Sequence, residues 1–390
     1  MKIGVIFGGN SVEHEISIIS AVQAMGSIDR NKYQIIPIYI TKKKEWYTGS
    51  ELFDIKNYHN TQSLLKRCKK VVLYENDGRF VLQNLTGLKR IVTEIDLAFP
   101  IVHGTNVEDG SLQGYLETIG IPYVGPNVLA SALGQDKVVM KQVFNEGGLP
   151  IVPFIWCFDQ EYQTNKKEIL KAIDELGYPV MVKPANLGSS IGITKAKNKD
   201  MIEEAIEEAF NYDSKVVVEK VIENLVEVNC SVIGNYTKYT PSVLEEVMGS
   251  DEFLSYQDKY VGNKKAKGTK SKGMAATNRV IPARIDNRLT KNIQDTALAA
   301  ARLINTSGVV RIDFLIDKKT EKYYINEINS IPGSLAFYLW PDKNLTQLTC
   351  ELIEIALHNA KIRAKKIYSF DTNILETTSL NGSKGAKKGK

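Results

Sequence analysis

The pattern of apolar and polar residues between positions 310 and 329 predicts a β-hairpin. Two mostly apolar, partly β-branched runs, 310–315 and 323–329, flank the polar segment 317–322. Runs of this length and composition are typical of strands, and the polar segment between them is typical of a turn.

Charged and amide side chains recur at every second position of this hairpin. Arg311 and Asp313 should share one face of the first strand, and Glu327 and Asn329 one face of the second, because strand side chains alternate between faces. Burying two carboxylates together is costly unless a cation neutralises them. Carboxylate and amide oxygens suit Mg²⁺, which proteins usually share with substrate phosphates. The alternative is an edge hairpin with a solvated charged face.

The rest of the chain alternates between strand-like and amphipathic helical runs. The strand 2–7, the helical run 16–25 and the strand 34–40 predict a βαβ unit on a parallel sheet. Residues 41–93 are polar, lysine-rich and irregular, and we expect a surface insertion that contains one hairpin. Further elements are expected in this order: strands 70–74 and 79–82, strand 95–100, helix 113–118, a helix from 137 to 147, strand 178–184, helix 201–210, strands 216–222 and 227–233, and helix 286–304.

Two loops of the first predicted sheet carry candidate functional residues. Glu13 follows the Gly8-Gly9 turn, and its spacing from Asn10 is equally that of a helix-capping box. His103 begins the loop 103–110 after a parallel strand, where ligands bind in such sheets. Its spacing from the acidic residues of this loop is not that of zinc ligands, which favours a positioning role.

A small glycine-serine loop follows Lys183 in the segment ANLGSSIGIT. Its backbone N–H groups and the hydroxyls of Ser189 and Ser190 could bind a phosphate. It is not a Walker loop, because no Gly-Lys-Ser/Thr opens a helix after it. Taken alone, a tight hairpin turn is the simpler interpretation.

Two further segments are candidates for nucleotide contacts. The strand 216–222 runs into a linker-like segment before Glu227, an arrangement that could hold an adenine edge and ribose hydroxyls; the simpler alternative is a sheet strand with a charged end. The glycine-dotted, lysine-rich segment 259–272 predicts a mobile lid over an anion, with a solvated lysine loop as the alternative.

Composition limits the class of protein. At 390 residues the chain is expected to form two or three domains. Its 43% hydrophobic and 24% charged residues are ordinary for a globular protein. We expect neither a membrane span nor a signal peptide, since no run of 18 apolar residues occurs and the N-terminus begins directly with a strand-like run. Four widely spaced cysteines without a C-x-x-C motif fit reduced thiols in the cytoplasm.

The net charge of +5 gives no sign of nucleic-acid binding. Most of it lies in residues 365–390, which hold six lysines and two acidic residues. The end of this tail is of low complexity, and we expect disorder there. No basic stripe with interleaved aromatic residues is visible elsewhere.

Taken together and in order, the motifs closely resemble those of the D-alanine–D-alanine ligases of the ATP-grasp superfamily. The matching segments are GGNSVEHEIS, HGTNVEDGSLQGYLE, VMVKPANLGSSIGI, VEVNCSVIGN, YQDKY and RIDF…NEINSIPG. The resemblance covers about residues 1–365. It implies an α/β protein with the ATP-grasp fold and ATP between its second and third domains. The implied domains are a Rossmann-like parallel-sheet domain for substrate at 1–126, with the insertion at 41–93, a small central α+β domain at 127–218, a C-terminal α+β domain at 219–364, and the tail 365–390.

The resemblance also assigns site residues. It places ATP at Lys137, Lys183, Ser189, Ser190, Glu219, Lys220, Ile222, Glu227, Lys259 and Leu315. The ligands of Mg²⁺, with Mn²⁺ as an alternative, would be Asp313, Glu327 and Asn329. Glu13 and His103 would contact the first D-alanine, and Ser334 and Leu335 the second. Arg311 and the Gly333 backbone would stabilise an oxyanion, and Tyr260 would link to Glu13 and Ser189.

These roles imply an ADP-forming ligase of peptidoglycan precursor synthesis. One D-alanine carboxylate attacks the γ-phosphate of ATP, and the amine of a second D-alanine then attacks the acyl phosphate. Cations and aligned donors suffice for this chemistry, which fits the lack of a visible Ser-His or Cys-His pair. The resemblance also implies a cytoplasmic homodimer. Alternatives are a ligase that uses D-lactate, D-serine or another amino acid, which the Lys259-Tyr260 pair disfavours, and an inactive ATP-binding regulator, which the complete metal-ligand set disfavours.

The chain departs from the family pattern in two places. Val107 stands where the family usually has glycine, and the segment after Gly333 is shorter than usual. A four-residue deletion aligns Ser334 with the serine that binds the acceptor carboxylate. An ungapped alignment would place Tyr338 there instead. We adopt the deletion.

Overall fold

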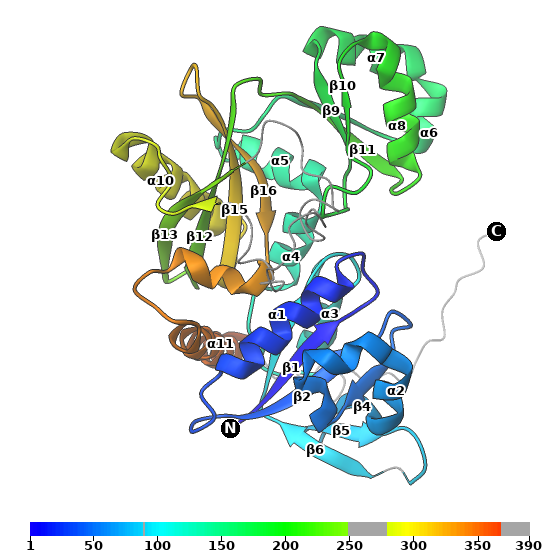
Figure 1. Ribbon diagram of the computed structural model, residues 1–390, viewed down its shortest axis with the longest axis vertical. Helices are drawn as coiled ribbons and strands as arrows, with labels where there is room; N and C mark the ends of the chain where they lie inside the picture. The colour runs from blue at the N-terminus through cyan, green and yellow to red at the C-terminus, as the bar shows by residue number, and fades with distance from the viewer. Residues whose placement is uncertain (89, 249–278, 368–390) are drawn as a thin grey trace, which may run out of the picture.

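The computed structural model describes residues 1–88, 90–248 and 279–367. In this part of the chain the strands form three sheets with helices packed against them, a mixed α/β architecture (Figure 1). The strand orders are β6-β5-β4-β3-β2-β1-β7, β10-β9-β11-β8 and β14-β13-β12-β15-β16.

The first sheet is built around the predicted βαβ unit, which is confirmed. Strands β1 (Lys2–Gly8), β2 (Gln34–Ile40) and β7 (Leu97–Val102) run parallel, and α1 (His14–Ser27) connects the first two. β1 and β7 are almost entirely buried, as parallel strands covered on both faces should be. The polar loops after β1 and β7 therefore emerge side by side at the carboxyl edge of the sheet.

Residues 41–93 extend this sheet by antiparallel pairing. The predicted hairpin is confirmed, with β4 (Lys69–Asn76) paired to β5 (Arg79–Asn84). Leu52, Leu64 and Leu82 are fully buried in the N-terminal core, so the inner side of this segment is not at the surface. Its polar composition did not indicate this, because each strand buries only alternate residues. The other elements here are β3 (Trp46–Thr48), η1 (Ser50–Phe53), η2 (Ile55–Asn60), α2 (Thr61–Arg67) and β6 (Ile91–Ile95).

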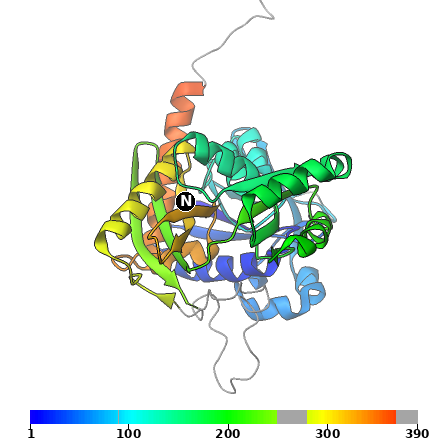
Figure 2. The same cartoon turned by 90° about the horizontal axis from the view of Figure 1, so that it is seen from above.

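The second sheet is small and antiparallel. Val216 and Val218 of β11 (Lys215–Lys220) pack in one cluster with the helices on one face, whereas Val217 packs with Val138 of α5 (Lys137–Glu146) on the other face. Figure 2 shows this sheet and its helices, in green, on the opposite side of the molecule from α10, in yellow. Its other elements are β8 (Phe154–Phe158), α6 (Asp159–Thr164), α7 (Lys166–Leu176), β9 (Val180–Pro184), β10 (Thr194–Ala196), η3 (Lys199–Met201) and α8 (Ile202–Phe210).

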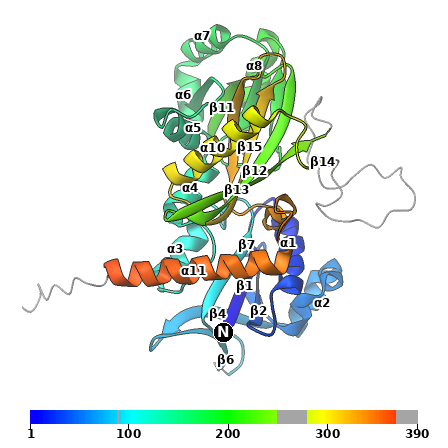
Figure 3. The same ribbon diagram turned by 90° about the vertical axis from the view of Figure 1, so that its left-hand side faces the viewer.

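The third sheet contains the predicted hairpin of β15 (Gly308–Asp317) and β16 (Tyr323–Asn329). Helix α10 (Asn287–Leu303) lies against the sheet (Figure 3) and begins at the cap residue Asp286, whose carboxylate accepts the Leu289 N–H at 2.9 Å. Helices α4 (Val128–Gln135) and α5 contribute to the same core. The remaining strands are β12 (Leu225–Asn235), β13 (Lys238–Val247) and β14 (Arg279–Val280).

The chain returns to the first sheet after this hairpin. Leu335 and Leu339 of η5 (Gly333–Leu339) and Leu348 of α11 (Leu345–Ile367) are buried in the N-terminal core. Figure 3 shows α11, in orange, crossing the molecule between the N-terminal sheet and the third sheet. The elements before and after the β15–β16 hairpin are thus tied to different sheets, which places the segment after its end beside α1. Helix α3 (Ser111–Thr118) packs against α4.

Candidate active site

The polar face predicted for the hairpin exists. Arg311 lies opposite Asn329 and Asp313 opposite Glu327 in the β15–β16 register. The guanidinium of Arg311 binds Asp313 with two bonds, Nε to Oδ1 at 2.7 Å and Nη2 to Oδ2 at 2.8 Å. Asn329 donates from Nδ2 to Oδ2 of the same carboxylate at 3.1 Å. The strand alternation therefore brings two carboxylates, an amide and a guanidinium together.

The electrostatics of this face suit an additional cation. Burial raises the pKa of Asp313, Arg311 acts to lower it, and the neighbouring Glu327 charge raises it again. The described residues contain no cluster of three or more His, Cys, Asp or Glu side chains that could hold a metal by themselves. Two carboxylates and an amide oxygen are ligand types that suit Mg²⁺, and a metal-binding role for this face stays a prediction.

A buried network of lysines joins the second and third sheets. Lys183 of β9 donates to Glu219 Oε2 at 2.8 Å and to Asn326 Oδ1 at 3.2 Å. Lys141 of α5 lies 3.3 Å from Glu219 Oε1 and donates to the Asn326 carbonyl at 3.3 Å. Burial acts to raise the pKa of Glu219, but the two lysines hold it at about 2. The carboxylate is therefore ionised, between two ammonium groups.

Lys137 connects this network to the hairpin. Its Nζ donates to the carbonyl of Leu187 in the glycine-serine loop at 2.7 Å and lies 3.9 Å from Glu327 Oε2. Lys137, Lys183 and the carboxylate pair are thus brought together, as expected for a phosphate-and-metal site.

The connection 221–224 joins two sheets, because β11 belongs to the second and β12 to the third. Ile222 is half-buried on this connection, and Glu227 lies directly across from Leu315 in the β12–β15 register. Lys220 donates through Nζ to the carbonyls of Gly177 and Tyr178 at 2.9 and 3.0 Å. Its ammonium is therefore bound to the segment before β9, and the ATP contact expected for Lys220 stays a prediction.

Glu13 does not cap α1 with its side chain, so the capping-box interpretation is wrong. It occupies the N-cap position, but its carboxylate makes no cap hydrogen bond. It instead accepts a hydrogen bond from the Ser189 hydroxyl at 2.5 Å. A Cβ atom at Gly104 or Gly188 would approach Glu13 Oε2 to 2.9 or 2.8 Å. The two glycines, one in each loop, therefore leave room for the Glu13 carboxylate.

The glycine-serine loop spans residues 185–193 and is longer than a tight hairpin turn, and its phosphate-binding role stays a prediction. It connects the antiparallel strands β9 and β10, so it is a strand connection. Ser189 and Ser190 within it adopt positive φ angles of 57° and 58°, which are uncommon for residues with side chains and are often found at functional sites. Ser189 uses this conformation to reach Glu13.

The loop after β7 is buried against the end of the hairpin. His103 Nε2 lies 3.2 Å from Ser20 Oγ, and burial, reinforced by the nearby Arg311 charge, lowers the pKa of His103 to about 4. Glu108 accepts hydrogen bonds from the Gly104 N–H at 2.8 Å and from the Ile331 N–H at 2.9 Å. Burial and the Glu13 charge raise the pKa of Glu108 to about 7.

Val107, the first departure from the family pattern, is a buried packing residue. It is buried, and its methyl groups pack against the backbone of Gly9, where a Cβ atom would come within 2.6 Å of Val107 Cγ1. The loop is therefore closed over the β1 turn at this position.

The shortened segment after Gly333 forms a left-handed turn. Ser334, Leu335 and Ala336 have φ angles of 52°, 56° and 48°. The Ser334 hydroxyl donates to Gln23 Oε1 at 2.8 Å, and the Ser334 N–H donates to Ser20 Oγ at 3.1 Å. The Leu335 side chain is buried in the N-terminal core and its N–H donates to the Pro332 carbonyl at 2.8 Å. Both residues contact protein groups, and their acceptor-binding roles stay predictions.

Tyr338, the residue of the ungapped alignment, lies in a separate polar cluster. Its hydroxyl donates to Glu245 Oε1 at 3.2 Å, and the Arg279 guanidinium lies 3.9 Å from its ring centroid. Arg279 also binds Glu245 Oε2 at 3.0 Å. The charges of Arg311 and Glu245 both act on the Tyr338 hydroxyl, so this cluster borders the hairpin face.

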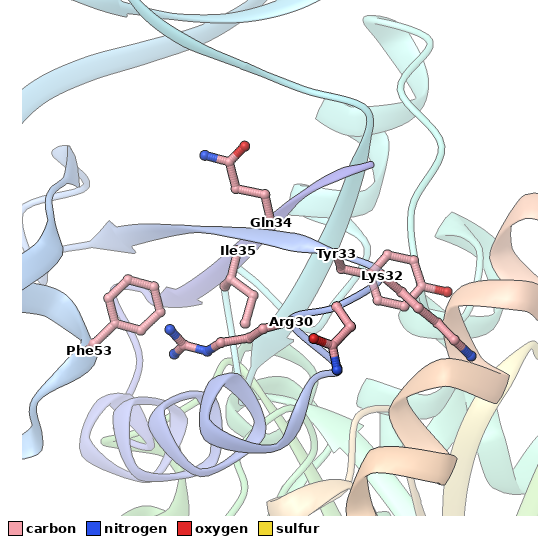
Figure 4. A pocket seen from close by; sticks show the side chains of 7 residues that line it. Arg30, Lys32, Tyr33, Gln34, Ile35 and Phe53 are labelled. Atoms are coloured by element: carbon pink, nitrogen blue, oxygen red, sulfur yellow. The ribbon is translucent and has the colours of Figure 1, made fainter.

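Lys259, Tyr260 and the predicted lid 259–272 lie outside the described residues. A hollow lined by Arg30, Lys32 and Phe53 (Figure 4) lies at the start of β2, where Gln34 pairs with Lys2. Ligands of parallel sheets bind at the opposite, carboxyl ends of the strands, where Glu13 and His103 are found.

Sequence reasoning missed several polar residues of the site. Lys141 and Asn326 complete the lysine network, and Glu245 anchors the Tyr338 cluster. Lys141 could have been found, because it stands four residues after Lys137 in a predicted helix and so shares its face. Glu245 could not, since nothing in the strand pattern of β13 relates it to Tyr338.

Comparison with known proteins identifies the family. The family models for the D-ala D-ala ligase N-terminus and C-terminus match residues 2–126 and 143–347. A D-alanine–D-alanine ligase from Thermosipho melanesiensis is 42% identical over 380 residues, covering 96% of this chain and 98% of the relative. The D-alanine–D-alanine ligase structure from Coxiella burnetii has a TM-score of 0.80 at 28% identity, covering 97% and 99%.

A second solved structure is the VanG D-Ala:D-Ser ligase from Enterococcus faecalis, with a TM-score of 0.76 at 33% identity and coverage of 91% and 99%. Both family models, the near-complete alignment with the Thermosipho melanesiensis relative and the shared fold agree with the motifs around the hairpin. The chain belongs to the D-alanine–D-alanine ligase family, with the ATP-grasp fold.

Proposed function

We propose that this protein joins two D-alanine molecules at the expense of ATP, forming ADP and phosphate, to supply peptidoglycan precursors. The observation that carries the proposal is the convergence of three structural units. The polar face of the β15–β16 hairpin would hold the metal, the buried lysine network would face the phosphates, and the region around the Glu13–Ser189 contact would hold the substrate.

ATP fits between the second and third sheets. Lys137 and Lys183 would face its phosphates, with Ser189 and Ser190 in the loop beside them. The connection 221–224 with Glu227 and Leu315 would hold the adenosine end. The assignment of Lys259 lies outside the described residues.

Asp313, Glu327 and Asn329 would hold Mg²⁺, or Mn²⁺ in its place. The bound ion would neutralise phosphate charge as the γ-phosphoryl group is transferred. The donor set fits this ion, because two carboxylates and an amide, whose oxygens suit Mg²⁺, face one another across the β15–β16 register.

In the first half-reaction an oxygen of the first D-alanine carboxylate forms a bond to the γ-phosphorus, and the bond to ADP breaks. Glu13 and His103 would orient this substrate. His103 is neutral near pH 7, because burial holds its pKa at about 4. It can therefore position the substrate by hydrogen bonding without adding charge.

In the second half-reaction the amine of the acceptor bonds to the carbonyl carbon of the acyl phosphate. Phosphate leaves, and the nitrogen gives up a proton. The tetrahedral intermediate carries an oxyanion, which Arg311 and the Gly333 N–H would stabilise. Arg311 stays charged, because Asp313 keeps its pKa well above the usual value despite its burial.

An ADP-release assay with product mass measurement tests the proposal. With ATP, Mg²⁺ and D-alanine as the sole amino acid, the purified protein should release ADP and form the D-alanyl-D-alanine dipeptide. D-Serine is the second candidate acceptor, because the VanG D-Ala:D-Ser ligase structure is 33% identical to this chain. A mixed D-alanyl-D-serine product as the main species would favour it, and no ADP release with any D-amino acid or D-lactate would contradict both.

Assembly and location are part of the same proposal. We infer a homodimer that works in the cytoplasm, where ATP is available and where the free cysteines would stay reduced. Within the described residues no helix has both the length and the apolar character needed to cross a membrane. Size-exclusion chromatography with light scattering would measure the molecular mass of the protein in solution. A monomer at all concentrations tested would contradict the dimer.

A further inference from the structure

Lys141 is a buried cation that the proposed mechanism does not yet use. Lys141 is fully buried, with 0% of its surface exposed, and it lies on α5 between the second and third sheets. A buried ammonium group is costly and persists only where it is paired. Its Nζ lies 3.3 Å from Glu219 Oε1 and donates to the Asn326 carbonyl at 3.3 Å.

The partners of Lys141 are shared with Lys183. Lys183 binds the other oxygen of Glu219 at 2.8 Å and the side chain of Asn326 at 3.2 Å. Two lysines therefore meet one carboxylate. Burial lowers the pKa of Lys141 and the Glu219 charge acts to raise it, and with both lysines protonated the group has one excess positive charge. A pair of Lys183 and Glu219 alone would be neutral.

The two lysines approach Glu219 from different elements of the structure. Lys141 approaches Glu219 from α5, whereas Lys183 lies on β9, the strand that leads directly into the glycine-serine loop. The excess charge of the group can thus act on an anion at the Lys183 side, while Lys141 remains enclosed.

We propose that Lys141 is a positioning residue for ATP: it balances the Glu219 charge, so that Lys183 presents a net positive charge to the phosphates. The inference rests on the proposed nucleotide site. Lys141 need not touch ATP, and its effect on binding is exerted through Glu219 and Lys183.

If Lys141 had only a structural role, Lys141→Met would mainly lower the stability of the protein. The positioning role predicts a different outcome. Replacing a member of a buried ion pair leaves the other charge unpaired, but here Glu219 keeps Lys183. A similarly long apolar side chain can fill the space of the lysine stem. Lys141→Met should therefore change the melting temperature little and act mainly on ligands that carry phosphate.

The experiment compares ATP with adenosine. Calorimetry on the full chain with Mg²⁺ should show a roughly tenfold or larger rise in the Kd of ATP for Lys141→Met, because the charge-assisted contact of Lys183 with the phosphates would be weakened. The inhibition constant of adenosine against ATP-analogue binding should change less than about twofold. Lys141→Arg should recover most of the ATP affinity.

The matched control is Lys215→Met, which removes a largely buried lysine of β11 that pairs with Asp136 and lies over the Phe158 ring. It should lower thermal stability without raising the Kd of ATP. Equal losses for ATP and adenosine in Lys141→Met, or an unchanged ATP affinity, would overturn the proposal. Binding is measured without turnover, so failure of the dipeptide reaction would be seen separately.

Discussion

The Ser189 hydroxyl lies 2.5 Å from Glu13 Oε1, although 176 residues separate them in the chain. The contact joins the glycine-serine loop of the second sheet to the start of α1 on the first sheet. The close approach depends on Gly188, because a Cβ atom there would lie 2.8 Å from the other oxygen of Glu13.

Gly188→Ala should therefore impair catalysis more than stability. The added methyl group would push the Glu13 carboxylate away, and we expect a fall of roughly tenfold in kcat/KM for D-alanine, since small misplacements of positioning groups are costly. Steady-state ADP release measures this. Gly114→Ala, in α3 where nothing lies near the new methyl group, is the control and should leave the kinetics unchanged. Equal kinetics for both variants would mean that the loop adjusts freely.

A second prediction concerns the hairpin carboxylates. Glu327→Gln removes one of two carboxylates that lie opposite each other in the register, and we expect a loss of at least about a hundredfold in ADP release. The loss should be partly relieved by higher Mg²⁺ concentrations. Glu321→Gln changes an exposed carboxylate in the turn of the same hairpin that pairs with Arg288 and should be silent. Wild-type activity of Glu327→Gln at ordinary Mg²⁺ would remove the hairpin from the active site.

The sequence predicted the hairpin face because alternation alone determines which residues share a side. It likewise predicted the first βαβ unit from its apolar runs. Lys141, Asn326 and Glu245 were missed because their importance arises from contacts between sheets, which no local pattern encodes. The role of Glu13 was undecided for the same reason: capping geometry is local, whereas Ser189 comes from another sheet.

The turn at Ser334 shows a different limit. Three successive residues with side chains adopt positive φ angles, each at a cost of roughly 1 kcal/mol or more. Composition gives no sign of this, since glycine or asparagine is the usual marker of such a conformation. The buried leucines of the turn, packed into the N-terminal core, stabilise it.

A third prediction uses the pH dependence of unfolding. The pKa of His103 is lowered to about 4 in the folded protein, below its ordinary value of 6.5. The folded state thus disfavours the proton, so stability from this group is intact above pH 6.5 and is lost as the pH falls toward 4. The loss should be about 3 kcal/mol in total. Chemical denaturation of wild type and His103→Asn between pH 4 and 7 should show a smaller slope for the variant; parallel curves would contradict the shift.

The last prediction separates the two alignments of the segment after Gly333. With the four-residue deletion, Ser334 binds the acceptor carboxylate, and a hydrogen bond to a charged group contributes about 1.5–3 kcal/mol, or roughly 10- to 150-fold in affinity. Ser334→Ala should raise the KM of the second D-alanine by about this factor. Affinity for ATP and for the first D-alanine should barely change.

The structure adds a control to this comparison. The Ser334 hydroxyl donates to Gln23 at 2.8 Å, so Gln23→Ala tests whether the contact with α1 orients the serine. A rise in acceptor KM smaller than that of Ser334→Ala would support orientation. Tyr338→Phe should be mild, because its hydroxyl is bound to Glu245 beneath Arg279. If Tyr338→Phe instead impairs acceptor binding while Ser334→Ala is silent, the ungapped alignment is correct. The acceptor would then meet a phenol beside an arginine, and D-alanine would have to be compared again with larger or more polar acceptors.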